Sequence, residues 1–432
     1  MREKTLATYL SGFRNHHQSE ALPGALPLAQ NSPQKVAYGL YAEQLSGSAF
    51  TSPRAHNLHS WLYRIHPSVI QNKTYPHARG ALFSMTDFAH PMPYLPLRWS
   101  PVYEKKDNAD FIDGLIPFAM SGPFHDPAAA CYLYAFSKTS SDTFYCNADA
   151  EWLWIPQKGN LELETEFGSL RIQAGEIAVI PRGVKFRLTL HSTDALGYLA
   201  ENYKTPFSLP ELGPIGANGL ANSRDFCTPV ARYEDKKGGF QLITKYQHTL
   251  WTTELSHSPL DVVAWHGNYT PYQYNLNHFN TMNTVSFDHP DPSIFTVLTS
   301  QSEILGTANM DFVIFPERWM VAEHTFRLPY YHRNVMSELM GLIEGQYDAK
   351  GDGFVPGGIS LHNAMVPHGP DAKGFHHSSE IPLKPEHYKG TLAFMLETRQ
   401  MWHVTQSLLT HPARQTDYPA CWQNLPYLFH HV

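Results

Sequence analysis

Three residues in the last third of the chain have the side-chain types and the spacing of a binding site for a single metal ion. His332 and Glu338 lie six positions apart within residues 329–345, and His368 lies in the segment 360–371. Two imidazoles and one carboxylate on one face of an iron ion leave the opposite face open for a substrate and for O₂. The pattern therefore predicts a non-haem iron oxygenase with these three residues as metal ligands.

The separation of His332 and Glu338 restricts the local structure that could bring them together. On a straight strand the two residues would be about 20 Å apart, and on a helix their side chains would point about 120° away from each other. The chain must therefore turn between them, and Asn334 and Ser337 are residues that favour turns. Proline and glycine beside His368 place it in a loop or at the end of a strand.

A histidine alone is weak evidence here, because the chain contains 25 of them. Glu338 is more informative, since it stands among apolar residues in the run VMSELMGLI. A carboxylate in such a run would be buried, and its burial is costly unless cations, hydrogen bonds or a metal ion stabilise the charge. The apolar setting of Glu338 therefore favours metal binding over a purely structural role.

The composition limits the class of protein. A chain of 432 residues can form two or three domains. Its 32 basic and 39 acidic residues give a net charge of −7, which argues against nucleic acid or an anionic membrane as a partner. The first residues lack an apolar signal region, no long apolar run occurs, and the four cysteines form no C-x-x-C pair. We expect a cytoplasmic protein, in a reducing compartment that would keep iron ferrous.

Short runs of β-branched and aromatic residues between Pro, Gly, Asn and Asp clusters predict a mainly β fold. Helical periodicity is weak and occurs only in 240–251 and 404–411. A long irregular connection is expected at 204–232, and the composition changes again near 275–283, where we place a domain boundary. Strands are predicted at 60–66, 130–136, 151–156, 160–167, 169–172, 176–181, 186–191, 293–299, 311–317 and 391–398.

Two segments resemble the sequence motifs of cupins, which are small jelly-roll barrels. The run GEIAVIPRGVKF matches the second cupin motif, except that Phe186 replaces its final histidine. Residues 332–345 match the first motif, although Asn334 stands where a second histidine is usual. We therefore predict two jelly-roll, cupin-like β domains. The N-terminal domain, 1–280, would be vestigial and structural, and the C-terminal domain, 281–432, would be catalytic and carry the metal site.

Longer segments extend the resemblance to one enzyme family over nearly the whole chain. The chain resembles the homogentisate 1,2-dioxygenases in GFRNHHQSEALPGALPLAQNSPQKVAYGLYAEQLSGSAFT near the start, DHPDPSIFTVLTS, FRLPYYHRNVMSELMGLI and GGISLHNAMVPHGPD. The resemblance implies Fe(II) held by His332, Glu338 and His368. It also implies a homohexamer built as a dimer of trimers.

The resemblance further implies the reaction and other site residues. Homogentisate, 2,5-dihydroxyphenylacetate, would react with O₂ and open to maleylacetoacetate in the catabolism of tyrosine and phenylalanine. His289 matches the proposed acid–base histidine of the family, and a histidine can hold or move a proton near neutral pH. Without the resemblance, its place in a Pro-Asp-Pro turn would favour a structural role. Tyr347 matches a tyrosine that contacts the substrate, and His368 is expected to contact the substrate as well as the metal. His362 is a further candidate for supporting a ligand, and Arg333 for pairing with an acidic substrate.

Other classes stay open at this point. Two histidines and a carboxylate also bind Mn or Zn, as in a sugar isomerase or hydrolase built on a cupin, and metal analysis with a test of O₂ dependence would separate these. A storage or sugar-binding protein with two cupin domains would need another partner for an acid in an apolar run. A ring-cleaving oxygenase for gentisate would share the ligand spacing and differ in the shape of its pocket.

Overall fold

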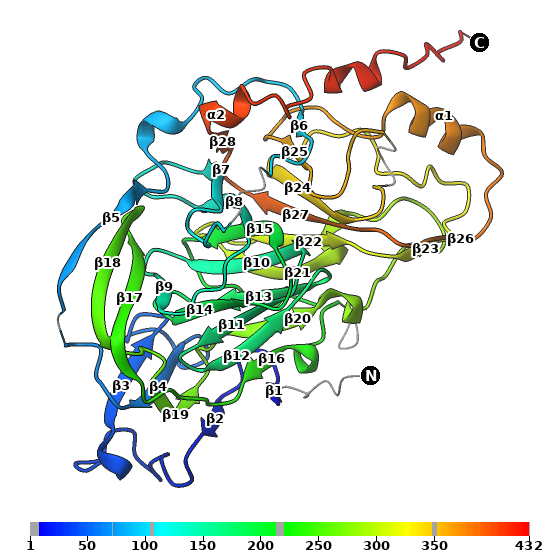
Figure 1. Ribbon diagram of the computed structural model, residues 1–432. Helices are drawn as coiled ribbons and strands as arrows, with labels where there is room; N and C mark the ends of the chain where they lie inside the picture. Colours follow the sequence, from blue (N-terminus) through cyan, green and yellow to red (C-terminus); the bar gives the residue numbers. More distant parts are fainter. Residues whose placement is uncertain (1–7, 71, 104–107, 213–219, 348–351, 432) are drawn as a thin grey trace.

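The computed structural model describes residues 8–70, 72–103, 108–212, 220–347 and 352–431 (Figure 1). The chain folds mainly into β-strands, and the predicted mainly β fold with two jelly-roll-like units is confirmed. Within the described residues, three large sheets of nine, seven and six strands contain most of the strands. The described residues also form two smaller sheets, one of four strands and one of two strands.

The nine-stranded sheet lies between the other two large sheets, and its central strands, such as β8 (Ala129–Phe136), are buried on both faces. All eight residues of β8 are buried, and successive side chains on a strand point to opposite faces. Cys131 and Leu133 belong to the core shared with the six-stranded sheet, whereas Tyr132 and Tyr134 belong to the core shared with the seven-stranded sheet. In order, the strands are β1 (Tyr9–Ser11), β16 (Cys227–Pro229), β20 (Tyr272–Asn275), β13 (Glu176–Ile180), β10 (Glu151–Lys158), β15 (Ala195–Asn202), β8 (Ala129–Phe136), β7 (Leu115–Ser121) and β28 (Trp402–Val404).

Two sheets complete the N-terminal part of the molecule. The seven-stranded sheet has the order β12 (Gly168–Ile172), β11 (Leu161–Thr165), β14 (Lys185–Leu190), β9 (Thr143–Asn147), β17 (Lys237–Tyr246), β18 (Thr249–His257) and β5 (Thr74–Ala81). The four-stranded sheet has the order β2 (His17–Glu20), β19 (Val262–Gly267), β4 (His59–Arg64) and β3 (Tyr41–Ser46).

The six-stranded sheet forms the C-terminal part, drawn mainly in yellow and orange in Figure 1. Its order is β21 (Thr296–Gln301), β22 (Ala308–Phe315), β27 (Leu392–Thr398), β24 (Ser337–Glu344), β25 (Ile359–His362) and β6 (Leu97–Trp99), and β23 (Arg318–Met320) pairs with β26 (Glu386–Tyr388). The two parts exchange strands. β6, from the first half of the chain, pairs with β25 in the six-stranded sheet, and β28, from the second half, pairs with β7 in the nine-stranded sheet.

Helices are few and short among the described residues. The α-helices are α1 (Ala372–Glu380) and α2 (Gln406–Leu409), and the 3₁₀ helices are η1 (Ala37–Gly39), η2 (Met85–Asp87), η4 (Ser223–Asp225), η5 (Leu276–His278), η6 (Pro292–Phe295) and η7 (Tyr418–Trp422). None of the helices in these described ranges is long and apolar enough to cross a membrane.

Most elements agree with the sequence predictions. Every predicted strand overlaps an observed one, although the start of 293–299 forms η6, and the weak helical signal at 404–411 contains α2. The helix predicted at 240–251 is wrong, because this segment forms the β17–β18 hairpin. Gln247 and His248 have φ angles of 50° and 63°, and two successive left-handed residues form the tight turn that such a hairpin requires.

Phe186 explains how the N-terminal barrel is filled at the position where the cupin motif would have a histidine. Its ring is fully buried and lies 5.6 Å from Trp152, 5.9 Å from Tyr145 and 6.1 Å from Trp154, measured between ring centroids. These aromatic rings occupy space that a bound ligand would need, and the structural role of this domain stays a prediction.

Candidate metal centre

The three predicted ligands come together because two loop segments run beside the first residues of β24. His332 and His368 form a short antiparallel bridge, in which His332 N donates to His368 O at 3.0 Å and His368 N donates to His332 O at 3.1 Å. The chain then bends before β24, and Asn334 Oδ1 accepts a hydrogen bond from Met336 N at 3.0 Å. Glu338 follows as the second residue of β24. The turn that the spacing predicted is therefore present.

The ligand atoms of His332, Glu338 and His368 all lie within 4.8 Å of one another. His368 Nε2 is 2.9 Å from Glu338 Oε2, and His332 Nε2 is 3.5 Å from Glu338 Oε1. The two imidazole rings are inclined by 62°, with centroids 4.2 Å apart. Because the rings are inclined rather than parallel, their Nε2 atoms can point toward one common position.

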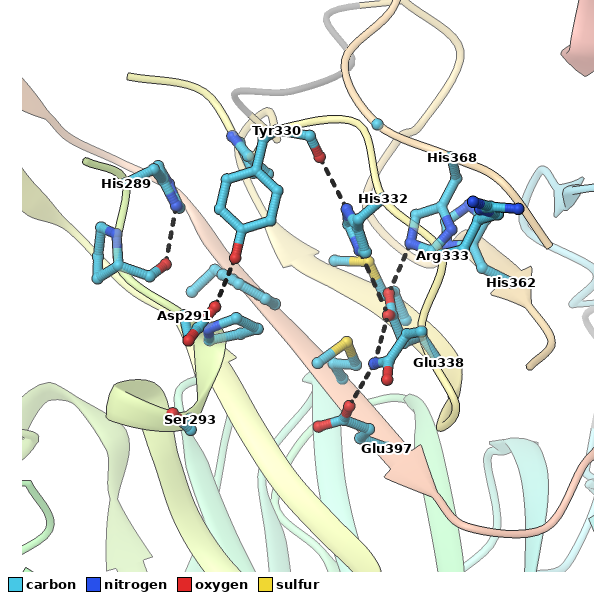
Figure 2. Close-up of a pocket in the computed structure, with 18 of the residues that line it drawn as sticks. His289, Asp291, Ser293, Tyr330, His332, Arg333, Glu338, His362, His368 and Glu397 are labelled. Atoms are coloured by element: carbon cyan, nitrogen blue, oxygen red, sulfur yellow. Dashed lines mark hydrogen bonds and ion pairs between the residues drawn. The ribbon is translucent and has the colours of Figure 1, made fainter. Parts of the chain in front are cut away.

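Backbone carbonyls fix which nitrogen of each ring faces this position (Figure 2). His332 Nδ1 lies 2.7 Å from Tyr330 O, as Figure 2 shows. His368 Nδ1 lies 2.9 Å from Val366 O. A carbonyl can only accept, so each Nδ1 carries a proton and donates it. This leaves Nε2 to bind a cation, which is the arrangement found in most histidine–metal sites. The residues present therefore fit a divalent metal ion.

The charge of Glu338 is stabilised although its side chain is buried. Burial acts to raise the pKa of this carboxyl, but the contacts with the ring nitrogens of His332 and His368 outweigh that effect and hold the pKa far below its usual value. The carboxylate therefore stays ionised in a mostly apolar setting. A metal cation at the same position would give this charge a direct partner.

A row of polar side chains crosses the sheet beside Glu338. Glu338 on β24 is directly opposite Glu397 on β27, which is opposite Asp311 on β22, and Glu338 is also opposite His362 on β25. Directly opposite residues point to the same face of a sheet. Burial and then the charge of Glu338 raise the pKa of Glu397 to about 7, against the hydrogen bond from Asn334. Burial raises the pKa of Asp311 to about 6.

A cavity of about 450 Å³ opens beside the candidate metal centre. Its walls include every predicted site residue and several residues that the sequence analysis did not identify, among them Tyr330, Phe315, Met340, Met395 and Glu397. Glu397 had the same signal as Glu338, because it is an acid in the apolar run TLAFMLET. The residues that line the cavity and were predicted are His289, His332, Arg333, Glu338, Tyr347, His362 and His368.

His289 lies on the side of the cavity opposite the ligand segment (Figure 2). Its Nδ1 is 2.8 Å from Pro290 O, so Nδ1 carries a proton and donates a hydrogen bond to this carbonyl, and Nε2 is the other ring nitrogen. Tyr330 packs against this ring, edge to face, at 6.4 Å between centroids, and its hydroxyl donates to Asp291. This bond and partial burial raise the pKa of Tyr330 to about 12, which keeps the phenol neutral.

His362 and Tyr347 form other parts of the wall. The ring of His362 stacks on that of His368 with centroids 4.1 Å apart and an angle of 8°, and His362 Nε2 is 3.2 Å from Tyr418 Oη. His362 thus limits the movement of a predicted ligand. Tyr347 is buried and packs against Phe315 at 5.6 Å. The roles of all these residues as ligands, acid–base groups or substrate contacts stay predictions.

A second group of possible ligands, His66, His257 and Asp261, lies in the N-terminal part. The two imidazoles are stacked at 3.7 Å with an angle of 17°, and nearly parallel rings do not direct their nitrogens to one point. Asp261 already accepts from Arg64 Nη2 at 2.8 Å and from His66 Nδ1 at 3.0 Å. Asp261 is therefore part of an ion-pair network with Arg64.

Family models and similar proteins match nearly the whole chain. The family model of the homogentisate 1,2-dioxygenase N-terminal domain matches residues 8–276, and that of the C-terminal domain matches residues 277–429. The chain is 56% identical to a homogentisate 1,2-dioxygenase from Legionella pneumophila strain Corby, over 96% of this chain and 98% of the relative. It is also 56% identical to one from Nitrobacter hamburgensis, over 96% of this chain and 94% of the relative.

Proposed function

This chain belongs to the homogentisate 1,2-dioxygenase family, a family of ring-cleaving dioxygenases, and from this premise we propose its metal, its product and the roles of its residues. The enzyme would use Fe(II) to convert homogentisate and O₂ into maleylacetoacetate, in the catabolism of tyrosine and phenylalanine. The observation that carries this proposal is the convergence of His332, Glu338 and His368 at the wall of one cavity.

The ligand set favours Fe(II) over the alternatives. His332 and His368 would hold the ion through Nε2, and Glu338 would hold it through its carboxylate. Two histidines and one carboxylate are the typical ligands of iron in oxygenases. When bound, the ion supplies Lewis acidity and a redox-active centre with open positions for the phenol of the substrate and for O₂. Zn and Mn bind the same ligand types, so metal content must be measured directly.

The cavity suits one substituted aromatic ring. Its volume of about 450 Å³ lies in the range of small-molecule sites. Phe315, Met340 and Met395 offer apolar contacts to a ring, and Tyr347 offers a hydroxyl that can hydrogen bond to the substrate. Arg333 places a cation at the same wall, and its planar guanidinium can bind a carboxylate through two hydrogen bonds.

His289 would hold or move the phenolic proton of the substrate. Its Nδ1 is directed at Pro290 O, so Nε2 is the atom that can accept a proton. An imidazole titrates near neutral pH, which suits a group that takes a proton from a phenol and returns it later. His368, as a ligand beside the same cavity, would contact the bound substrate as well.

We also propose a cytoplasmic homohexamer, a dimer of trimers. Large apolar side chains are exposed among the described residues, including Val285 at 71%, Phe287 at 62% and Val335 at 67%. Apolar groups exposed together often mark contacts between subunits. Light scattering coupled to gel filtration would give a mass close to six times 49.0 kDa if this is correct.

The first experiment is to load the purified protein with Fe(II) without oxygen and to follow O₂ uptake with homogentisate, with gentisate as the comparison. One O₂ per homogentisate, absent without iron, would support metal and substrate together. Bound iron with uptake only on gentisate would reject the substrate, and no bound iron would reject the metal. Glu338→Gln tests the site, and Glu344→Gln is its matched control, because Glu344 is the exposed last residue of the same strand.

A further inference from the structure

The side chain of Asn334 connects two carboxylates at the candidate metal centre. Asn334 Nδ2 donates to Glu338 Oε1 at 3.1 Å and to Glu397 Oε1 at 2.7 Å, which are among the dashed contacts of Figure 2. Its Oδ1 accepts from Met336 N at 3.0 Å, and its backbone carbonyl accepts from Met365 N at 2.7 Å. The amide therefore has a partner at each end, and its backbone is tied to the loop that carries His368.

These contacts allow one orientation of the amide. An asparagine side chain has two N–H donors on one end and a carbonyl acceptor on the other. A rotated amide would direct Oδ1 at two carboxylate oxygens and Nδ2 at a backbone N–H, so both ends would face groups of their own kind. Glu397 thus acts as an anchor. Because it accepts one N–H of the Asn334 amide, the other N–H of that amide is directed at Glu338.

The two oxygens of Glu338 consequently have different surroundings. Oε2 lies 2.9 Å from His368 Nε2, on the side where the three ligands converge. Oε1 is held by Asn334 at 3.1 Å and is 3.5 Å from His332 Nε2. An oxygen that accepts a strong hydrogen bond from a fixed donor is less available to a cation.

We propose that Asn334 is a positioning residue that keeps Glu338 bound to the metal through Oε2 alone, with Glu397 as its anchor. A carboxylate that used both oxygens would take one of the positions that the substrate and O₂ require. Asn334 also stands where the first cupin motif has a second histidine. The position would thus supply a hydrogen bond in place of a further ligand. This inference rests on the metal site proposed above.

The test measures metal binding by the whole protein and not only turnover. Asn334→Ala and the nearly isosteric Asn334→Asp both remove the N–H donors, and either one serves if the other fails to fold. Each apoprotein would be titrated with Co(II) in competition with a chelator, and the visible spectrum of bound Co(II) would report the number of ligands. Supporting contacts of this kind change metal affinity by roughly 10- to 100-fold.

Two further variants separate positioning from general folding effects. Glu397→Gln keeps an oxygen that can accept from Asn334, so it should keep the Co(II) spectrum of the unmodified protein. Asn363→Ala is the matched control, because Asn363 is a buried amide whose side chain bonds to Trp402 N and O at 2.9 Å rather than to Glu338. It should change stability but not the spectrum.

The proposal expects a changed Co(II) spectrum and a changed affinity in the Asn334 variants alone. An affinity and a spectrum equal to those of the unmodified protein in a folded Asn334 variant would overturn it, while leaving the metal site in place. The same spectral change in Asn363→Ala would overturn it as well. If the unmodified protein binds neither Fe(II) nor Co(II), the proposed metal site fails, and this inference fails with it.

Discussion

Replacing Asp311 by asparagine should stabilise the folded protein at neutral pH and have no such effect in acid. Asp311 lies on β22, opposite Glu397 on one side and Thr299 on the other. Burial raises its pKa from 3.8 to about 6, although a hydrogen bond from Thr299 acts in the opposite direction. The folded protein therefore binds this proton more tightly than the unfolded chain does. Asparagine has almost the same shape, can still accept from Thr299, and carries no charge at any pH.

The size and the sign follow from the two pKa values. Their difference, 6 minus 3.8, is about 2, and each pH unit corresponds to about 1.4 kcal/mol, which gives about 3 kcal/mol. Well below pH 3.8 the group is protonated in both states, so its contribution to stability is fully present. Between about pH 4 and pH 6 that contribution is lost as the pH rises, because only the unfolded chain releases its proton freely. Partial solvent access lowers the value, so about 3 kcal/mol is the upper limit.

Denaturant unfolding at a series of pH values and at fixed protein concentration measures this effect. The free energy of unfolding of Asp311→Asn minus that of the unmodified protein should be near zero at about pH 4 and positive at about pH 7. Asp417→Asn is the control, because Asp417 is exposed and makes no side-chain capping bond. A difference that is negative at neutral pH, or that does not change with pH, would refute the reasoning.

Four other expectations concern the site and its sheet. Glu338→Gln removes the charged ligand, so anaerobically loaded protein should contain little iron and turn over slowly; full iron content with normal turnover would contradict the assignment. A chelator should lower the melting temperature of the iron-loaded protein, because an ion at 100 times its dissociation constant adds about 2.7 kcal/mol; an unchanged melting curve would count against a bound ion. Gly341→Ala should destabilise the fold by roughly 1–3 kcal/mol, since its Cβ would lie 2.3 Å from Phe394 Cε1. A free energy of unfolding equal to that of the unmodified protein would show that the Phe394 ring can move. Tyr330→Phe removes the hydroxyl bonded to Asp291, a loss of about 1 kcal/mol, and should raise KM for homogentisate more than it lowers kcat.

The strands were predictable where the sequence has runs of β-branched and aromatic residues. β8 is buried throughout and β10 in its first six residues, and both read as largely apolar runs because their sheet is covered on both faces. The β17–β18 hairpin was missed for a definite reason. Its turn consists of Gln247 and His248 in left-handed conformations, which are usually signalled by Asn or Gly. Tertiary packing, and not local preference, holds this turn.

The candidate site was predictable only in part. Glu338 could be selected because an acid in an apolar run needs a partner, and the same argument applies to Glu397. The row from Asp311 through Glu397 to Glu338 depends on the register of β22, β27 and β24. Register joins residues that are far apart in sequence, so no local pattern reveals it. The exchange of β6 and β28 between the two parts was hidden for the same reason.

The filled N-terminal barrel still contributes to the site, because it holds the strand that carries Glu338. Tyr198 on β15 is fully buried, and its hydroxyl donates to Gly358 O at 2.9 Å and lies 3.2 Å from Leu342 O on β24. Its ring packs edge to face on Phe394 of β27 at 4.8 Å. A metal centre works only if its ligands are held rigidly by their surroundings. The central sheet, buried on both faces, provides that rigidity for β24 and β27. A barrel filled with aromatic rings is therefore suited to support the open cavity beside it.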